Sequence, residues 1–195
     1  MKLILASTSR IRGELLARAG ITFEAIAPAV NETELKRQFA GLSPGDLAQK
    51  LAAAKAVSVT NRYPGALVIG ADQVLNLEGR AFDKPDSIES ARRQLTDLRG
   101  RRHVLETALC CAQDGKVVWR HLGQAGLTMR EFSEPFLTDY LREVGLDVTT
   151  SVGGYKLEGR GAQLFDKIDG DYFTILGLPL LPLLDFLRCR GVLPA

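Results

Sequence analysis

The spacing of apolar residues along the chain predicts alternating strands and helices. Continuous apolar runs, as in residues 2–6 and 66–69, are typical of strands that are covered on both faces. Apolar positions three or four residues apart follow several of these runs, and serines, prolines and glycines mark where the helices begin and end. Helices are therefore expected over residues 11–19, 43–57, 87–98, 133–141 and 178–187.

The second half of the chain adds antiparallel pairs to this pattern. Residues 103–113 and 116–129 flank Asp114-Gly115, a strong hairpin signal. Further strands are expected at residues 23–27 and 154–157, and a hairpin at residues 75–82. We therefore expect an α/β fold with a mixed, curved β-sheet flanked by helices, forming a single domain over residues 1–195.

Composition and charge narrow the class of protein. The chain has 195 residues, of which 46% are hydrophobic, enough for one sizeable core or two small lobes. A formal net charge of +2 provides no global field for nucleic acid or an anionic membrane. The apolar start, MKLILA, is shorter than the core of a signal peptide. We expect a cytoplasmic protein that binds neither nucleic acid nor membranes.

Cysteines and histidines offer no obvious chemistry. Cys110, Cys111 and Cys189 lack the spacing of metal ligands and are expected to be small, buried hydrophobic residues in a reducing compartment. His103 and His121 are too isolated for a histidine-based metal site or triad, so we expect structural roles for both. The candidate chemistry therefore lies with carboxylates and cations.

Asp72 is the acidic residue that the hydrophobic pattern singles out. The run at residues 66–69 continues through Gly70-Ala71 to Asp72, and hydrophobicity resumes at Val74. Because a charge inside a strand is costly, we expect Asp72 at the strand's end, in a cleft, facing a cation or a proton to be taken. The alternative is that Asp72 only caps a turn into the following hairpin.

The first strand leads through Ser7-Thr8-Ser9 into the first helix. This geometry directs backbone N–H groups and the positive end of a helix to one place, with Arg10 and Arg12 nearby, and predicts a phosphate site. A plain N-cap with solvated arginines is the alternative. Glu32 lies in a short polar stretch expected to be a loop, either as a metal ligand or as an ordinary surface carboxylate.

Several motifs occur in an order that resembles one family. They are LASTSRIRGELL, Asn31-Glu32-Thr33, residues 51–56 (LAAAKA), VIGADQV, Asp83-Lys84-Pro85, RGRRHVLET, GGYKLEGRG and ILGLPL. Together they cover nearly the whole chain and resemble the Maf family of nucleoside triphosphate pyrophosphatases. The resemblance implies a cleft between two lobes, a homodimer and a divalent cation, Mg²⁺ or Mn²⁺. It also implies cleavage between the α- and β-phosphates of a nucleoside triphosphate.

The resemblance implies roles for the charged residues. Asp72 corresponds to the acidic catalytic residue, which we expect to act as general base or to position water beside the metal, and Glu32 is expected to ligate the metal with it. Residues expected to contact the phosphates are Lys55, Lys84, Ser7, Ser9 and Arg12.

Three further positions bear on the base of the substrate. Gln73 and Glu158 resemble the subgroup that acts on 7-methylguanosine triphosphate, and a carboxylate can accept from the ring N–H and amino group of guanine. Ile11 replaces the tryptophan of that subgroup, and Asn31 stands where an aspartate is common. Activity on thymidine or uridine triphosphate, and a non-catalytic nucleotide-binding regulator of cell division, are the alternatives.

Overall fold

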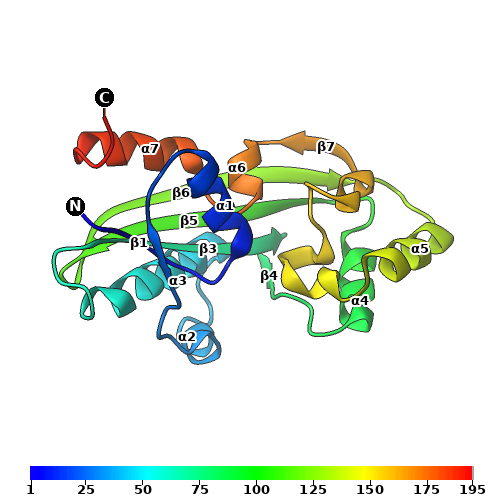
Figure 1. The fold of residues 1–195 in the computed structure, drawn as a ribbon. Coiled ribbons are helices and arrows are strands. Elements are labelled where there is room, and N and C mark those ends of the chain that lie inside the picture. Colours follow the sequence, from blue (N-terminus) through cyan, green and yellow to red (C-terminus); the bar gives the residue numbers. More distant parts are fainter. Residues whose placement is uncertain (195) are drawn as a thin grey trace. The chain divides into compact units, whose positions relative to one another are not determined.

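The computed structural model describes residues 1–194, and the chain forms two compact units. Unit 1 contains residues Met1–Gln73, Thr107–Gly123 and the stretch that begins at Asp171; unit 2 contains Val74–Glu106 and Gln124–Gly170. The strands form one mixed sheet, with β4 (Arg80–Phe82) paired to β3 (Leu67–Leu77) (Figure 1). Their order is β2 (Glu24–Ile26), β1 (Leu3–Ala6), β3, β5 (Arg102–Gln113), β6 (Lys116–Met129) and β7 (Phe165–Asp169). The predicted α/β fold with a mixed sheet is confirmed.

Unit 1 is built on parallel strands. Its elements are β1 (Leu3–Ala6), α1 (Arg10–Arg18), β2 (Glu24–Ile26), α2 (Glu32–Gln38), α3 (Pro44–Thr60), α6 (Tyr172–Ile175), α7 (Leu180–Cys189) and parts of β3 (Leu67–Leu77), β5 (Arg102–Gln113) and β6 (Lys116–Met129). β1 pairs in parallel with β2 and with β3, where Ala6 lies opposite Gly70.

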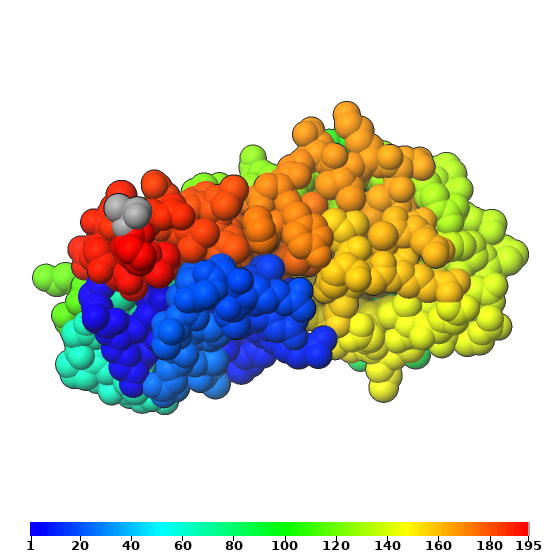
Figure 2. Space-filling model, turned by 45° about the horizontal axis from the view of Figure 1, so that its top comes forward, coloured from blue at the N-terminus to red at the C-terminus, as the bar shows by residue number. Residues whose placement is uncertain are grey.

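The strands of unit 1 are covered on both faces. Leucines of β1, α1, β3 and α7 form one buried cluster, and Figure 2 shows α7 lying beside the N-terminal residues. On the other face α3 approaches β3 so closely that a Cβ on Gly70 would lie 2.2 Å from the carbonyl oxygen of Ala52. Gly70 therefore permits the contact that brings the middle of α3 against β3.

Unit 2 contains the β3–β4 hairpin, two α-helices and the 3₁₀ helices. Its elements are β4 (Arg80–Phe82), α4 (Ile88–Leu98), α5 (Glu134–Val144), the 3₁₀ helices η1 (Gly145–Thr150), η2 (Val152–Gly154) and η3 (Arg160–Leu164), β7 (Phe165–Asp169), and the remaining parts of β3, β5 and β6. β4 pairs antiparallel with β3, and β7 with β6.

Local sequence signals predicted many of these boundaries. Ser43, Ser87 and Ser133 accept hydrogen bonds from backbone N–H groups as the N-caps of α3, α4 and α5. Asp114 and Gly115 have φ angles of 48° and 77°, the combination that a type I′ hairpin turn requires. These elements are confirmed within three residues at each end.

Three expectations about local structure were wrong. Residues 154–157 form no strand, because Gly153 and Gly154 adopt positive φ angles of 78° and 71° that end the extended conformation. β7 and α2 were not predicted, and Glu32 begins α2 instead of lying in a loop. Asp72 lies within the long strand β3, two residues beyond the end of its pairing with β1, and not at the strand's end.

In the part of the chain from residue 1 to 194, no helix is long and apolar enough to cross a membrane. The two adjacent cysteines, Cys110 and Cys111, are buried in β5, as expected for small hydrophobic side chains. Cys189 is exposed at the end of α7, which differs from the expected burial.

Candidate active site

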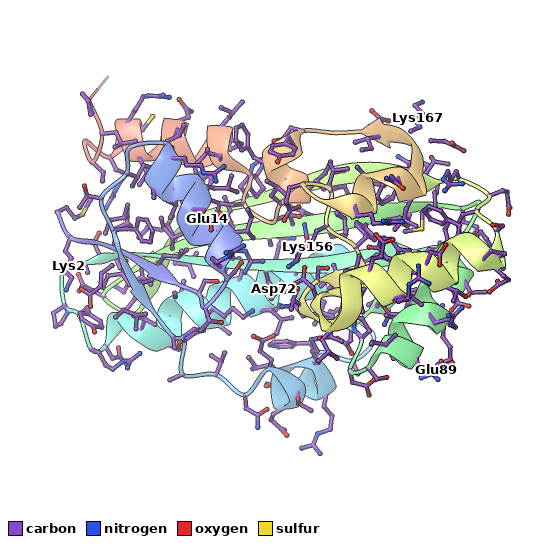
Figure 3. The ribbon with its side chains drawn as sticks, turned by 45° about the vertical axis from the view of Figure 1, so that its right-hand side comes forward. Lys2, Glu14, Asp72, Glu89, Lys156 and Lys167 are labelled. Atoms are coloured by element: carbon purple, nitrogen blue, oxygen red, sulfur yellow. The ribbon has the colours of Figure 1, made fainter. Side chains whose placement is uncertain are left out.

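Two carboxylates of unit 1 lie within salt-bridge distance of one lysine nitrogen atom. Lys55 Nζ lies 2.6 Å from Asp72 Oδ1 and 2.9 Å from Glu32 Oε1. The Lys55 and Asp72 side chains are each 9% exposed, whereas that of Glu32 is 46% exposed. We call Glu32, Lys55 and Asp72 the Lys55 cluster; Figure 3 shows Asp72 on β3 beside α3.

Local structure explains how the Lys55 cluster forms. Lys55 lies on α3 between Ala52 and Ala56, the two residues whose backbone atoms a Cβ on Gly70 would meet. The close approach at Gly70 therefore sets Lys55 beside Asp72, two residues further along β3. Asn31 Oδ1 accepts from the N–H of Glu34 at 3.1 Å, so Asn31 caps the helix on which Glu32 is the first residue.

The electrostatics of the cluster are set by burial. Desolvation raises the pKa of Asp72, and the opposing attraction of Lys55 and Arg12 does not cancel that effect. Glu32 adds to the rise in the pKa because it is a like charge. A carboxylate with a raised pKa is a better proton acceptor than an ordinary aspartate, which suits general-base chemistry.

Arg12 is held beside the cluster by backbone oxygens. Its Nε donates to the carbonyl of Gly177 at 2.8 Å, and its Nη1 donates to the carbonyl of Ala71 at 3.0 Å. Desolvation by burial lowers the pKa of Arg12, although an arginine stays protonated at any working pH. The alternative of a solvated arginine therefore fails for Arg12, while Arg10 is 90% exposed and pairs with Glu14.

The turn before α1 contains the two serines that were expected to contact a phosphate, Ser7 and Ser9, and only Ser7 lies beside Arg12. Ser9 occupies the N-cap position without a side-chain cap bond. Ser7 Oγ accepts from the N–H of Ser9 at 3.1 Å and lies 3.5 Å from Arg12 Nη1. The structure thus brings Ser7 and Arg12 together next to Ala71, the residue that precedes Asp72.

Gln73 and Ile11, the two positions of unit 1 expected to bear on the base, both contact other parts of unit 1. Gln73 Nε2 lies 2.9 Å from Thr107 Oγ1, 3.0 Å from the Thr174 carbonyl and 3.1 Å from the Ile175 carbonyl. Its amide nitrogen is therefore engaged by protein oxygens. Ile11 is partly buried and packs against the hydrophobic cluster of unit 1.

Lys84 and Glu158 belong to unit 2. Lys84 is exposed in the loop between β4 and α4. Glu158 is exposed and lines a cavity of about 280 Å³ together with Lys156, Asp147 and Arg160. Lys156 Nζ pairs with Asp147 Oδ1 at 2.5 Å, and Arg160 pairs with Glu143 on α5.

The donor set in unit 1 fits a hard divalent cation that is shared with a substrate. Among residues 1–194, no three histidine, cysteine or acidic side chains come close enough together to form a complete metal site. Two carboxylates, from Glu32 and Asp72, do meet at Lys55. Mg²⁺ is typically bound by one or two carboxylates plus substrate phosphates, so this pair suits Mg²⁺ or Mn²⁺ and not a closed all-protein site.

Several residues that shape the site were missed by sequence reasoning. Thr107, Asp171, Thr174 and Gly177 contact Gln73, Arg12 or one another. Thr107 ends the motif RGRRHVLET and Gly177 lies in ILGLPL, so both stood in motifs that carried the family resemblance. No spacing rule connects them to Arg12, because 165 residues separate Arg12 from Gly177.

The whole chain is similar to known proteins. The family model described as Maf-like protein matches residues 2–190. A 7-methyl-GTP pyrophosphatase of Mesorhizobium japonicum is 50% identical over 194 residues, covering 98% of each chain. A nucleoside triphosphate pyrophosphatase of Hyphomonas neptunium is 49% identical over 192 residues, covering 97% of this chain and 96% of the relative.

Among solved structures, a nucleoside-triphosphatase described as a dITP/XTP pyrophosphatase, from Mycobacterium abscessus, aligns with a TM-score of 0.46 and 14% identity, covering 100% of this chain and 98% of that chain. The expected family is confirmed by the match over residues 2–190 and by relatives that are about half identical along their whole length. This chain belongs to the Maf family.

Proposed function

We propose that this protein is an enzyme that hydrolyses a nucleoside triphosphate to the monophosphate and pyrophosphate with the help of a divalent cation. The observation that carries the proposal is the Lys55 cluster, where one ammonium group lies 2.6 Å from the carboxylate of Asp72 and 2.9 Å from that of Glu32. The names of the relatives support the same reaction.

Each residue of the cluster has a task in this reaction. Water attacks the α-phosphorus, a new P–O bond forms, and the bond from the α-phosphorus to the bridging oxygen breaks to release pyrophosphate. Asp72, with its raised pKa, orients the water and takes its proton before passing it to solvent. Lys55 and Arg12 oppose the negative charge on the phosphoryl oxygens.

A divalent cation would be held by Glu32 and Asp72 and would supply charge neutralisation on the phosphate oxygens. Lys55, which pairs with both carboxylates, would add its positive charge to that of the cation near the phosphate oxygens. Lys84 is proposed as a second phosphate contact, and Ser7 and Ser9 as hydroxyl donors from the turn before α1.

The proposed substrate is a modified guanosine triphosphate such as the 7-methyl form, whose removal prevents incorporation of a non-standard nucleotide. Two features support this choice: some relatives are named 7-methyl-GTP pyrophosphatases, and the carboxylate of Glu158 lines the cavity of unit 2. A carboxylate suits the cationic methylated ring better than an amide does. Gln73 supports it less directly, since its amide nitrogen is bound to protein oxygens.

Thymidine or uridine triphosphate remains the alternative substrate, because Ile11 lacks the aromatic surface expected for the 7-methylguanosine subgroup. A non-catalytic regulator that binds nucleotide is the alternative function. The homodimer and the cytoplasmic location implied by the sequence remain proposals as well.

The test is pyrophosphate release from 7-methylguanosine, guanosine, thymidine and uridine triphosphates with Mg²⁺ or Mn²⁺, for the wild type and for Asp72→Asn. Release by the wild type that is lost in the variant supports the reaction, and the preferred substrate decides the role of Glu158. Tight nucleotide binding without any release overturns the enzyme and leaves the regulator.

A further inference from the structure

Gln73 and Thr107 anchor a turn that the proposed chemistry does not use directly. Thr107 Oγ1 donates to the carbonyl of Thr174 at 3.0 Å and accepts from Gln73 Nε2 at 2.9 Å. Gln73 Nε2 also lies within 3.1 Å of the carbonyls of Thr174 and Ile175. Thr107 is fully buried on β5, so its bond to the Thr174 carbonyl is made away from water, while Gln73 is partly buried. We call residues 171–178 the α6 segment.

Two further features fix the α6 segment: a cap at its own first residue and close packing against β6. Asp171 caps α6 by accepting from the N–H groups of Phe173 and Thr174, and it also accepts from the hydroxyl of Thr174. On the side of β6, a Cβ on Gly123 would lie 3.0 Å from Thr174 Oγ1, which shows how closely the strand packs against the segment. The position of Thr174 is therefore set by several contacts at once.

The same segment ends at the carbonyl that holds Arg12. Gly177 has a φ of 90°, and its carbonyl accepts from Arg12 Nε at 2.8 Å. A side chain at position 177 would be strained, and its Cβ would lie only 3.3 Å from the Arg12 guanidinium. The other anchored nitrogen of Arg12 binds the carbonyl of Ala71, next to Asp72.

We propose that Thr107 and Gln73 are positioning residues for Arg12. They hold the α6 segment, and the Gly177 carbonyl at its end sets the orientation of the guanidinium beside Asp72. Gln73 then influences the reaction through Arg12, by way of the hydrogen bonds that its amide nitrogen makes. This inference rests on the proposed function only where it assigns Arg12 to a phosphate; the placement of Arg12 itself rests on the hydrogen bonds.

Thr107→Val is the sharpest change, because valine keeps the shape of threonine and removes the hydroxyl. Without it the Thr174 carbonyl loses one donor and Gln73 Nε2 loses one acceptor, in a place that water does not reach. Thr107→Ser keeps the hydroxyl and serves as the conservative rescue. Thr60→Val is the matched control, since Thr60 is also buried and its hydroxyl donates to the carbonyl of Val57 at 2.8 Å.

The first readout does not depend on any activity. The Arg12 Nε–H signal in ¹⁵N–¹H spectra is assigned by its loss in Arg12→Lys, and its hydrogen exchange is then compared among the variants. We expect exchange to accelerate about fivefold to tenfold in Thr107→Val, and to stay near the wild-type rate in Thr107→Ser and Thr60→Val.

The second readout is pyrophosphate release. Thr107→Val is expected to lower kcat/KM about tenfold, with a fall in kcat as well as a rise in KM, because Arg12 is proposed to oppose the charge on the phosphoryl oxygens. In an Arg12→Lys background the same change should have almost no further effect, because the fork-shaped guanidinium it positions is gone.

Unchanged exchange in Thr107→Val overturns the inference, and so does equal acceleration in Thr60→Val, which would reflect general loosening of unit 1. Full additivity with Arg12→Lys also overturns it. If the wild type releases no pyrophosphate from any triphosphate, the proposed function fails, while the exchange measurement still decides whether Thr107 positions Arg12.

Discussion

In unit 1 three charged side chains meet at Lys55 Nζ, whereas in unit 2 the buried His103 Nε2 shares a hydrogen bond of 2.7 Å with the hydroxyl of Tyr155. Burial acts on both places, but with different results. It raises the pKa of Asp72, although Lys55 and Arg12 oppose the rise, and it lowers the pKa of His103 to about 4.

Burial therefore makes Asp72 a reactive carboxylate and makes His103 a neutral side chain. Asp72 is charged only at an electrostatic cost that a cation or a proton relieves, so it is suited to catalysis. His103 remains uncharged at neutral pH, and its ring lies near those of Tyr155 and Phe165, tilted to both. Its expected structural role is consistent with this environment.

The largest expected effect is on activity. Asp72→Asn should lower kcat by about 10²–10³, the loss typical of removing one oriented catalytic group. Its stability should equal or exceed that of the wild type, because the raised pKa means that burying the charged carboxylate disfavours folding at neutral pH. Steady-state kinetics and thermal unfolding of both proteins check this. A parallel fall in Tm and activity would contradict a catalytic role.

The next effect concerns stability against pH in unit 2. The folded-state pKa of His103, about 4, lies below the ordinary value of 6.5, so its stabilising contribution is complete above pH 6.5 and is lost as the pH falls towards 4. The loss amounts to roughly 3 kcal/mol over that window at 1.36 kcal/mol per pKa unit.

His103→Gln keeps a hydrogen-bonding group for Tyr155 but does not titrate, so the gap in unfolding free energy between wild type and variant should shrink as the pH falls. Urea titrations at pH 7.5, 5.5 and 4.5 measure the gap. Asp72→Asn is the control, and its unfolding free energy should keep the pH dependence that His103 causes. A gap that is constant with pH would show that folding does not lower the pKa of His103.

A smaller effect is expected at the contact that assembles the Lys55 cluster. A Cβ on Gly70 would lie 2.2 Å from the Ala52 carbonyl and 2.7 Å from the Ala56 nitrogen, so Gly70→Ala must push α3 away. We expect a loss of about 1–3 kcal/mol in unfolding free energy. Activity should also fall, because Lys55 moves with α3.

Gly13→Ala is the matched control for stability. Gly13 lies in α1, and a Cβ there would be 3.7 Å from the ring of Phe23, an ordinary contact. Alanine should therefore stabilise the helix by up to about 1 kcal/mol. Chemical denaturation of both variants checks the contrast, and a Gly70→Ala protein as stable as the wild type would refute the close-approach argument.

Features that depend on contacts between residues close in the sequence were predicted correctly, and features without such a local signal were missed. Ser43, Ser87 and Ser133 act on backbone groups three residues away, so their capping roles were readable locally. The same holds for the turn at Asp114-Gly115, where only the local φ angles matter. The missed helix α2 has no buried residue, and therefore no apolar stripe that periodicity could detect.

Among the candidate site residues, the sequence identified the participants but not their partners. Asp72 was named from the hydrophobic pattern, Glu32 from its polar stretch and Lys55 through the motif resemblance, and the structure joins them at a single nitrogen atom. The amide nitrogen of Gln73 lies within 3.1 Å of protein oxygens that are up to 102 residues away, and no local pattern indicates these contacts. Lys84 and Glu158 remain predictions.

The sequence by itself determined the alternation of strands and helices, their caps and turns, and the family to which the chain belongs, because these depend on local backbone preferences and on motif order. Only the tertiary structure decided that Gly70 lets α3 reach β3, and that Gly177 holds Arg12 across 165 residues. Close packing and the satisfaction of buried donors select such contacts, and neither is a property of any short stretch of chain.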